Sequence, residues 1–217
     1  MILVKPSYKI LSMPDSLEII ELAARTCYKT EDKLGSNPNF ISDRVKQGHE
    51  SIIEHLSITV KFICDRGVSH ELVRHRLCAF SQESTRYCNY KGGVTFIIPF
   101  WVHIAPGEYL DIDNPGDGVE GCSHEDYLWW ESMCISEIGY ETFINNGWSP
   151  QQARSILPNS LKTEIVVTAN LREWRHIIKL RCSMKAHPQM REIMVPLSVE
   201  LHNKFPSIFG EDYGLIG

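Results

Sequence analysis

Alternating hydrophobic and polar positions predict a small number of β-strands in this chain. From Leu56 to Phe62 every second residue is apolar, and the residues between them are Ser57, Thr59 and Lys61. A strand with this period buries one face and leaves the other polar, so we expect a strand at residues 55–63. Two shorter runs predict further strands at residues 94–98 and 162–168.

Helical spacing is more frequent than strand spacing in the sequence. Asp15 and Glu18 form a capping-box pattern before an apolar helical face, which predicts a helix near residues 16–28. A second, short helix is expected at residues 40–47, with Gly48 as the residue that ends it.

Five later helices are expected from capping residues and from proline. Serine or asparagine stands at the N-cap of four of them, and proline opens the fifth. The helices begin after Ser69 (with Leu72, Val73 and Leu77 as the apolar face), after Ser123 (ending near Gly147), after Ser149 (with Pro150 and Gln152 in the first turn), after Asn170 (with Glu173) and at Pro188. Proline lacks a backbone N–H, so Pro196 is expected to kink the last helix.

Helices therefore dominate, and the few strands do not alternate with them as βαβ units. The sequence also contains neither GxGxxG nor GxxxxGK[ST], so a Rossmann or P-loop fold is not expected. We predict an α+β fold, a single domain over residues 1–217 in which several helices pack on a small, mostly antiparallel sheet. Residues 104–126, rich in glycine, proline and acids, are expected to form a loop.

Composition and charge narrow the classes of function. The chain is 43% hydrophobic and carries a net charge of -5, whereas nucleic-acid-binding domains are usually basic. No apolar run approaches the roughly 18 residues of a membrane span. The seven cysteines include no CxxC pair, so neither a zinc ribbon nor a disulfide framework is expected. We expect a cytoplasmic protein whose cysteines are reduced.

The densest cluster of reactive side chains is Arg74-His75-Arg76, followed by Ser84-Thr85-Arg86-Tyr87. A guanidinium group presents a planar fork of donors that matches the oxygens of a phosphate or carboxylate. Three such groups so close together predict a site for an anionic ligand with more than one phosphate, or for two ligands that meet there.

This cluster resembles a known family. Arg-His-Arg followed after seven residues by Ser84 is similar to the signature of the flavin-dependent thymidylate synthases. Other segments resemble the family in the same order along the chain, over about residues 20–200. They are Ala24-Arg25-Thr26-Cys27-Tyr28, the segment His49-Glu50-Ser51-Ile52-Ile53-Glu54-His55, Arg154 with Pro158, Asn170-Leu171-Arg172, Leu180-Arg181, and His187 with Glu192.

The resemblance implies the fold of that family and a homotetramer that binds FAD where subunits meet. It also implies reductive methylation of dUMP to dTMP, with 5,10-methylenetetrahydrofolate as carbon donor and NADPH-reduced FAD as hydride source. No enzyme cysteine attacks the pyrimidine in that family. The sequence agrees, because none of its cysteines stands in a recognisable nucleophile motif.

The same resemblance assigns candidate site residues. Arg181 is similar to the arginine that activates dUMP, since a permanent cation near the ring stabilises developing negative charge. His49 is similar to a histidine near the reacting centre. The residues similar to cofactor contacts are Cys27, Ser51, Glu54, Arg74, His75, Arg76, Gln82, Asn170, Arg172, His176 and His187. Those similar to nucleotide contacts are Glu71, Arg74, Gln82, Glu83, Ser84, Thr85, Arg86, Arg154 and Arg181.

Three positions depart from the family pattern. The family commonly has Gln at the position of Glu71 and Glu at that of Gln82, and some relatives have Asn at that of His176. These departures leave open a second hypothesis, a nucleotide-binding protein without catalysis.

Two further alternatives rest on single groups of residues. A metal-dependent hydrolase could use His49, Glu50, Glu54 and His55, although the two histidines are six positions apart and do not form HExxH. A serine hydrolase could pair Ser84 with His75, although the sequence lacks GxSxG.

Overall fold

The computed structural model describes residues 1–109 and 119–210. The chain divides into two compact units that interleave along the sequence. Unit 1 contains residues 1–7, 62–72 and 81–165, and unit 2 contains residues 8–61, 73–80 and 166–217. Helices and strands occur in both, which confirms the α+β prediction, while the single-domain prediction stays a prediction.

Unit 1 is built around a three-stranded mixed sheet with the order β5-β1-β6. The strands are β1 (Ile2–Val4), β5 (Thr95–Ile97) and β6 (Gly107–Glu108). β1 pairs with β5 in parallel and with β6 antiparallel. This sheet is thus mixed, with one parallel and one antiparallel pair.

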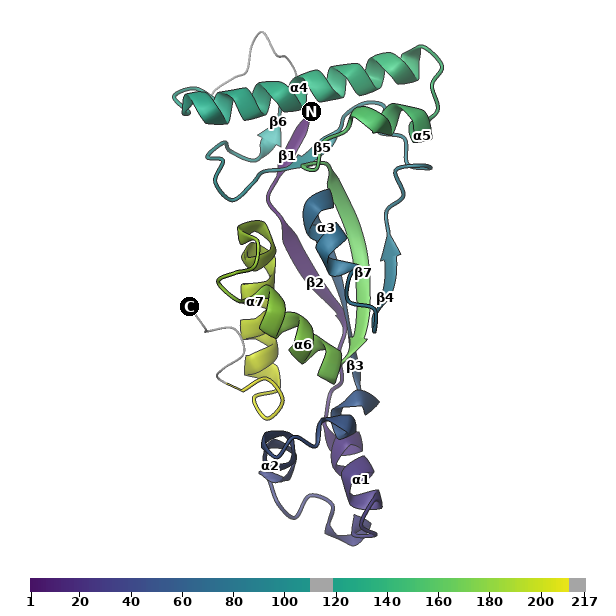
Figure 1. Ribbon diagram of the computed structural model, residues 1–217, viewed down its shortest axis with the longest axis vertical. Coiled ribbons are helices and arrows are strands. Elements are labelled where there is room, and N and C mark those ends of the chain that lie inside the picture. Colours follow the sequence, from purple (N-terminus) through teal and green to yellow (C-terminus); the bar gives the residue numbers. More distant parts are fainter. Residues whose placement is uncertain (110–118, 211–217) are drawn as a thin grey trace. The chain divides into compact units, whose positions relative to one another are not determined.

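The long helix α4 (His124–Asn145) supplies the apolar cover of unit 1 (Figure 1). Trp130 and Tyr140 of α4 are fully buried with Leu3 and Phe96 of the sheet strands in one hydrophobic cluster. Ser123 caps the helix as predicted, since its Oγ accepts a hydrogen bond from the backbone N–H of Asp126 at 3.1 Å. The unit also contains α3 (Arg66–Leu72), α5 (Pro150–Ala153) and the 3₁₀ helix η3 (Arg154–Ile156).

A second sheet has the strand order β2-β3-β7-β4. Its strands are β2 (Ser7–Ser12), β3 (Ser57–Asp65), β4 (Ala79–Gln82) and β7 (Lys162–Asn170). Each of these strands contributes residues to both units. Buried and less buried positions alternate along β3 and β7, which confirms the strands predicted at residues 55–63 and 162–168.

Unit 2 gathers the shorter N-terminal helices and the two C-terminal ones. They are α1 (Glu18–Thr26), α2 (Phe40–Lys46), the 3₁₀ helices η1 (Glu31–Lys33) and η2 (Glu50–His55), α6 (Leu171–Arg181) and α7 (Pro188–Lys204). α6 contacts both η2 and α7. Trp174 anchors α6, because its buried indole N–H donates to the carbonyl oxygen of Ile58 at 3.0 Å.

Two predicted helix starts are wrong. The first helix begins at Glu18 and its N-cap is Leu17, without a side-chain cap from Asp15. Ser69 does not open α3 but lies inside it, and its hydroxyl donates to the carbonyl oxygen of Arg66. The helix ends at Leu72, so Val73 and Leu77, expected on its apolar face, lie beyond it and are exposed.

The remaining helix predictions are confirmed to within a residue or two. Asn170 caps α6, and Pro188 is in the first turn of α7, with Pro196 inside that helix. The loop predicted at residues 104–126 contains β6 and the start of α4, and its middle lies outside the described residues. Within the parts of the chain that the structure describes, none of the helices combines the length and apolar character needed to cross a lipid bilayer.

Candidate active site

A cleft in unit 2, here called the α6 cleft, lies between α6 and η2. Its volume is about 560 Å³, which falls within the usual range of ligand pockets, roughly 300–1,000 Å³. The cleft is lined by Glu50, Glu54, Leu77, Asn170, Arg172, Glu173, Arg175, His176 and Lys179. Four of these, Glu54, Asn170, Arg172 and His176, are residues for which the family resemblance implies flavin contact.

The spacing of residues along α6 explains why basic side chains face the cleft. Arg172, Arg175, His176 and Lys179 follow one another at intervals that share a helical face. The opposite face is apolar and buried. Asn170 fixes the start of the helix, because its Oδ1 accepts from the backbone N–H of Glu173 at 2.9 Å.

Carboxylates from η2 pair with the arginines of this face. Arg172 Nη1 lies 2.6 Å from Glu54 Oε1, and its Nε lies 3.5 Å from Glu50 Oε2. Arg175 Nη2 lies 3.3 Å from Glu50 Oε1. The Arg172 side chain is 51% exposed, and ion pairs this exposed contribute little to stability. An anionic ligand can therefore replace Glu54 as the partner of Arg172 at low cost.

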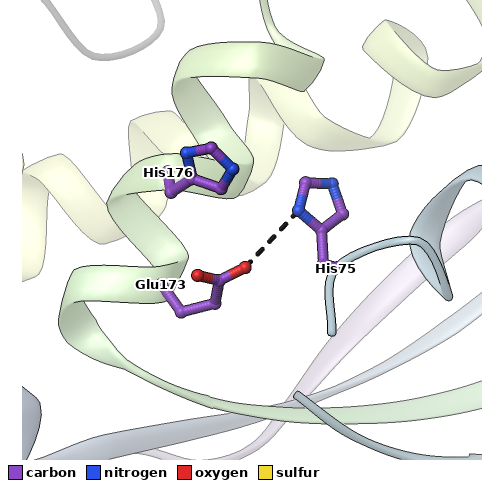
Figure 2. A group of neighbouring side chains, drawn as sticks. All are labelled: His75, Glu173 and His176. Carbon is purple, nitrogen blue, oxygen red and sulfur yellow. Dashed lines mark ion pairs between the residues drawn. The ribbon is translucent and has the colours of Figure 1, made fainter. Parts of the chain in front are cut away.

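His75 lies beside the cleft and connects it to Arg181. The Nε–H of Arg181 donates to Nε2 of His75 at 3.0 Å, and Nδ1 of His75 lies 3.5 Å from Glu173 Oε1. Figure 2 shows the His75 ring pointing toward Glu173 and His176, which are both on α6. The rings of His75 and His176 meet edge to face with their centroids 5.7 Å apart.

These surroundings keep His75 neutral near pH 7. Burial lowers the pKa of His75 to about 4, and the neighbouring Arg181 and His176 add to the shift because they disfavour a further positive charge. Nε2 accepts from Arg181, so the proton of the neutral ring is on Nδ1, on the side of Glu173. His75 is thus a neutral link between the guanidinium of Arg181 and the carboxylate of Glu173.

A second cleft of unit 2, here called the α1 cleft, has a volume of about 470 Å³. Among its lining residues are Cys27, His49 and Ser51, all predicted from the resemblance. The guanidinium carbon of Arg25 lies over the ring of Phe40, 4.3 Å from the ring centroid. The two predicted catalytic residues do not line the same cleft. His49 lines the α1 cleft, whereas Arg181 lines neither cleft and donates a hydrogen bond to His75.

Unit 1 holds most of the predicted nucleotide contacts. A pocket of about 210 Å³ is lined by Thr85 and Arg154 together with Arg66, His70, Ser155, Leu157, Pro158, Asn159 and Leu161. Arg154 Nη1 donates to Thr85 Oγ1 at 2.9 Å. Two cations and a buried hydroxyl group thus face a small space, as expected for a phosphate or another small anion.

Hydrogen bonds fix residues 82–84 next to this pocket. Glu83 accepts from the hydroxyl of Tyr90 at 2.9 Å and from Nζ of Lys162 at 3.1 Å, and its backbone N–H donates to Glu164. The amide nitrogen of Gln82 donates to Ser69 Oγ at 2.9 Å and to Thr163 Oγ1 at 3.2 Å. The carboxamide at position 82 therefore has partners within unit 1.

The other predicted residues do not line the α6 cleft, the α1 cleft or the pocket of unit 1. Arg74 and Arg76 are exposed in the turns after α3, and Glu71 is half-buried within α3. Ser84 Oγ accepts from the backbone N–H of Arg86, whose guanidinium lies over the ring of Tyr87 at 5.4 Å. His187 is the exposed N-cap residue of α7.

Sequence reasoning missed several residues of the α6 cleft. Arg175, Lys179 and Glu173 line it, but none was a candidate. The signal was present for Arg175 and Lys179, because both fall on the helical face of Arg172. Glu173 was read only as the partner of Asn170 at the helix start, and its side chain is nonetheless buried beside His75.

The hypothesis of a metal site at residues 49–55 receives no support among the described residues. Over residues 1–109 and 119–210, one group of three potential metal ligands has donor atoms that all lie within 4.8 Å of one another. It consists of His75, Glu173 and His176. His49 and His55 are not part of it. Of that segment, His49 and Ser51 face the α1 cleft, while Glu50 and Glu54 face the α6 cleft.

A solved structure has a similar fold. The crystal structure of the UMP/dUMP methylase PolB from Streptomyces cacaoi, bound with 5-Br dUMP, superposes with a TM-score of 0.75 and covers 96% of this chain and 95% of that one. At 22% sequence identity the likeness concerns the fold.

Curated relatives are similar over most of the chain. A flavin-dependent thymidylate synthase of Corynebacterium diphtheriae is 32% identical, over 91% of this chain and 79% of its own length. That of Geobacter sulfurreducens is 29% identical, over 90% of this chain and 82% of its own length. Residues 9–207 match the family described as thymidylate synthase complementing protein. With the motifs that place Arg74–Arg76, Arg172 and Arg181, these matches lead to one conclusion: the chain belongs to the thymidylate synthase complementing protein family, whose members include the flavin-dependent thymidylate synthases.

Proposed function

We propose that this protein is a flavin-dependent thymidylate synthase that methylates dUMP to dTMP. The carbon donor is 5,10-methylenetetrahydrofolate, and NADPH is the reductant. One observation carries the proposal: the ordered motifs fall inside a family match over residues 9–207, and four residues that resemble flavin contacts line the α6 cleft. The working form is a cytoplasmic homotetramer, as the family resemblance implies.

The α6 cleft suits the anionic part of FAD. Arg172, Arg175 and Lys179 place positive charge along one wall, and the capped N-terminus of α6 lies at the Asn170 end. Charge-assisted hydrogen bonds from these groups to phosphate are among the stronger polar contacts in proteins. FAD, when bound, supplies the hydride that completes the methyl group.

Arg181 acts on the pyrimidine in this proposal. The neutral His75 ring accepts from Nε of Arg181 and so orients the guanidinium without competing for positive charge. A guanidinium held in this way stabilises negative charge on the ring of dUMP as it develops. Arg154 and Thr85 of unit 1 line a pocket that suits a phosphate group, with the backbone of residues 83–85 beside it.

The cysteines fit a reaction without a thiolate nucleophile. Burial raises the pKa of Cys78 to about 12 and that of Cys134 to about 11. It also raises the pKa of Cys64 and of Cys182. These thiols therefore stay protonated at neutral pH, and a protonated thiol is a poor nucleophile.

The test is the visible absorption spectrum of the purified protein. Flavin bands are expected, and NADPH with dUMP should bleach them without oxygen. They should return when methylenetetrahydrofolate is added, with dTMP formed. If no flavin band appears even after incubation with FAD, the clefts hold another anionic ligand.

A second candidate function is a nucleotide-binding protein without catalysis. It is favoured by the side chain of Gln82, which stands where the family commonly has Glu and is engaged with Ser69 and Thr163. Bound flavin and dUMP without dTMP formation would support it. NADPH-dependent formation of dTMP would eliminate it.

A further inference from the structure

Three potential metal ligands lie together at the edge of the α6 cleft. They are His75, Glu173 and His176, whose donor atoms all lie within 4.8 Å of one another (Figure 2). The proposed function uses His75 to orient Arg181 and His176 as a flavin contact, and it gives no role to Glu173. Two imidazoles and one carboxylate are a ligand set that Zn²⁺ takes in open sites, where water fills the fourth position.

The distances suit a tetrahedral ion. Bonds of about 2.0–2.2 Å at tetrahedral angles place neighbouring ligand atoms about 3.4 Å apart, and Nδ1 of His75 is 3.5 Å from Glu173 Oε1. Glu173 and His176 are three residues apart on α6, so both project from one face of a single helix. The site therefore needs only small side-chain rotations to close around an ion.

Burial gives the cluster two fixed ligands and one open side. The side chains of His75 and Glu173 are only 4% and 8% exposed, whereas His176 is exposed and lines the α6 cleft. An ion can enter from the cleft and keep a water molecule on that side.

We propose that the flavin-free protein binds Zn²⁺ through Nδ1 of His75, a carboxylate oxygen of Glu173 and a ring nitrogen of His176. When Nδ1 becomes a ligand, the proton of the neutral His75 ring moves to Nε2. Nε2 then carries an N–H and no longer accepts from Nε of Arg181, at present 3.0 Å away. Zinc binding and the Arg181–His75 hydrogen bond are thus mutually exclusive.

This coupling gives zinc an inhibitory role. If Arg181 activates dUMP, an ion at His75 removes the group that orients its guanidinium. The ion also occupies the space of two residues that resemble flavin contacts, so zinc and FAD compete. Both consequences rest on the proposed function, whereas binding of the metal does not.

The test is a calorimetric titration of the full chain, stripped with a chelator and free of flavin, with Zn²⁺ alone. One saturable site is expected, and Co²⁺ should show the intense visible bands of a tetrahedral site. Loss of an outer-shell partner already costs about 10–100-fold in metal affinity, so His176→Ala is expected to weaken binding at least about tenfold. His176 is exposed, so this change leaves the fold intact.

Two matched variants locate the site. His103→Ala removes a histidine whose side chain is 81% exposed in unit 1, and His55→Ala removes the histidine of the alternative metal motif. Both should bind Zn²⁺ like the wild type. Absence of saturable binding, unchanged binding by His176→Ala, or binding lost in His55→Ala would each overturn the proposal.

Arg181→Ala and FAD test the coupling. Without this competitor, zinc should bind at least about tenfold more tightly. Looser or equal binding would contradict the exclusion. Added FAD should raise the apparent Kd for zinc. A protein that binds zinc but never FAD would refute the proposed function and leave the metal site standing.

Discussion

The segment of residues 82–85 in unit 1 and the α6 cleft in unit 2 hold their polar groups differently. In unit 1, Glu83 and Thr85 bond partners from other elements, so the segment is fixed before any ligand arrives. In the α6 cleft, Arg172 pairs with two carboxylates that also line the cleft. The first region is prebuilt, while in the second a ligand must displace an ion pair.

This difference predicts which substitutions change both stability and ligand binding and which change ligand binding alone. A side chain of the prebuilt segment supports both stability and binding, because removing it leaves a partner unsatisfied. An exposed arginine of the cleft supports binding alone, since its ion pair contributes little to the fold. Arg181 stands apart from both, because it is predicted to contact the nucleotide and also to stabilise charge in the transition state.

The largest effect is expected for Arg181→Lys. Lysine keeps the charge but loses the planar fork and the Nε–H that His75 accepts. Loss of a group that stabilises transition-state charge costs on the order of 10²–10³ in turnover. We expect a loss of that order in dTMP formation, with flavin still bound at wild-type stoichiometry.

The matched control for this variant is Arg191→Lys. Arg191 donates to the carbonyl oxygen of Cys182 and lines none of the three spaces described above. Its replacement should leave turnover close to wild type. Near-wild-type turnover of Arg181→Lys would reject the assigned role.

Arg172→Ala should weaken retention of FAD. A charge-assisted hydrogen bond contributes about 1.5–3 kcal/mol, so the Kd for FAD should rise at least about tenfold, while the melting temperature changes little. Flavin fluorescence during dilution measures this loss. The control is Lys46→Ala, an exposed cation at the end of α2. Unchanged flavin stoichiometry in Arg172→Ala, or a large fall in its stability, would break the comparison.

Tyr90→Phe should affect stability and nucleotide binding together. The change removes the hydroxyl that donates to Glu83 at 2.9 Å, so about 1 kcal/mol of unfolding free energy should be lost. The KM for dUMP should rise a few-fold, because residues 83–85 are less well fixed. Urea unfolding and steady-state kinetics measure the two effects.

Tyr87→Phe is the control for this prediction. Tyr87 lies two residues beyond this segment and is 76% exposed. It should change neither quantity. A Tyr90→Phe variant with full stability would show that the segment is not fixed by this bond.

Local signals predicted the elements that depend on local contacts. Ser123 and Asn170 each accept a backbone hydrogen bond three residues ahead, so short sequence patterns were sufficient to place α4 and α6. Asp15 and Ser69 carry similar patterns but do not cap. At Ser69 the burial of α3 outweighs the cap, because the helix extends back to Arg66.

Long-range contacts could not be read from the sequence. β1 pairs with β5, more than ninety positions away, and its three residues have no alternating period. The same holds for the candidate active site, because only the folded structure shows that Glu173 lies beside His75. The motifs named four residues of the α6 cleft and the residues of the 82–85 segment, but not Glu173, Arg175 and Lys179, nor the bonds that distinguish the two regions.

The free energy of unfolding is also expected to depend on pH through His75. In the folded protein burial, Arg181 and His176 lower the pKa of His75 to about 4, against 6.5 for an ordinary histidine. Between these values the unfolded chain binds the proton more tightly, so this residue makes the free energy of unfolding fall as the pH drops from about 6.5 toward 4. Above pH 6.5 the contribution of His75 to the free energy of unfolding no longer changes with pH.

His75→Asn removes this titration and keeps a polar side chain of similar reach. The difference in unfolding free energy between the variant and the wild type should therefore be constant above pH 6.5 and shrink below it, as followed by urea unfolding. The exposed His103, replaced in the same way, should leave the slope unchanged. Parallel profiles down to pH 4 would mean that His75 keeps an ordinary pKa, and its neutral link between Arg181 and Glu173 would then be wrong.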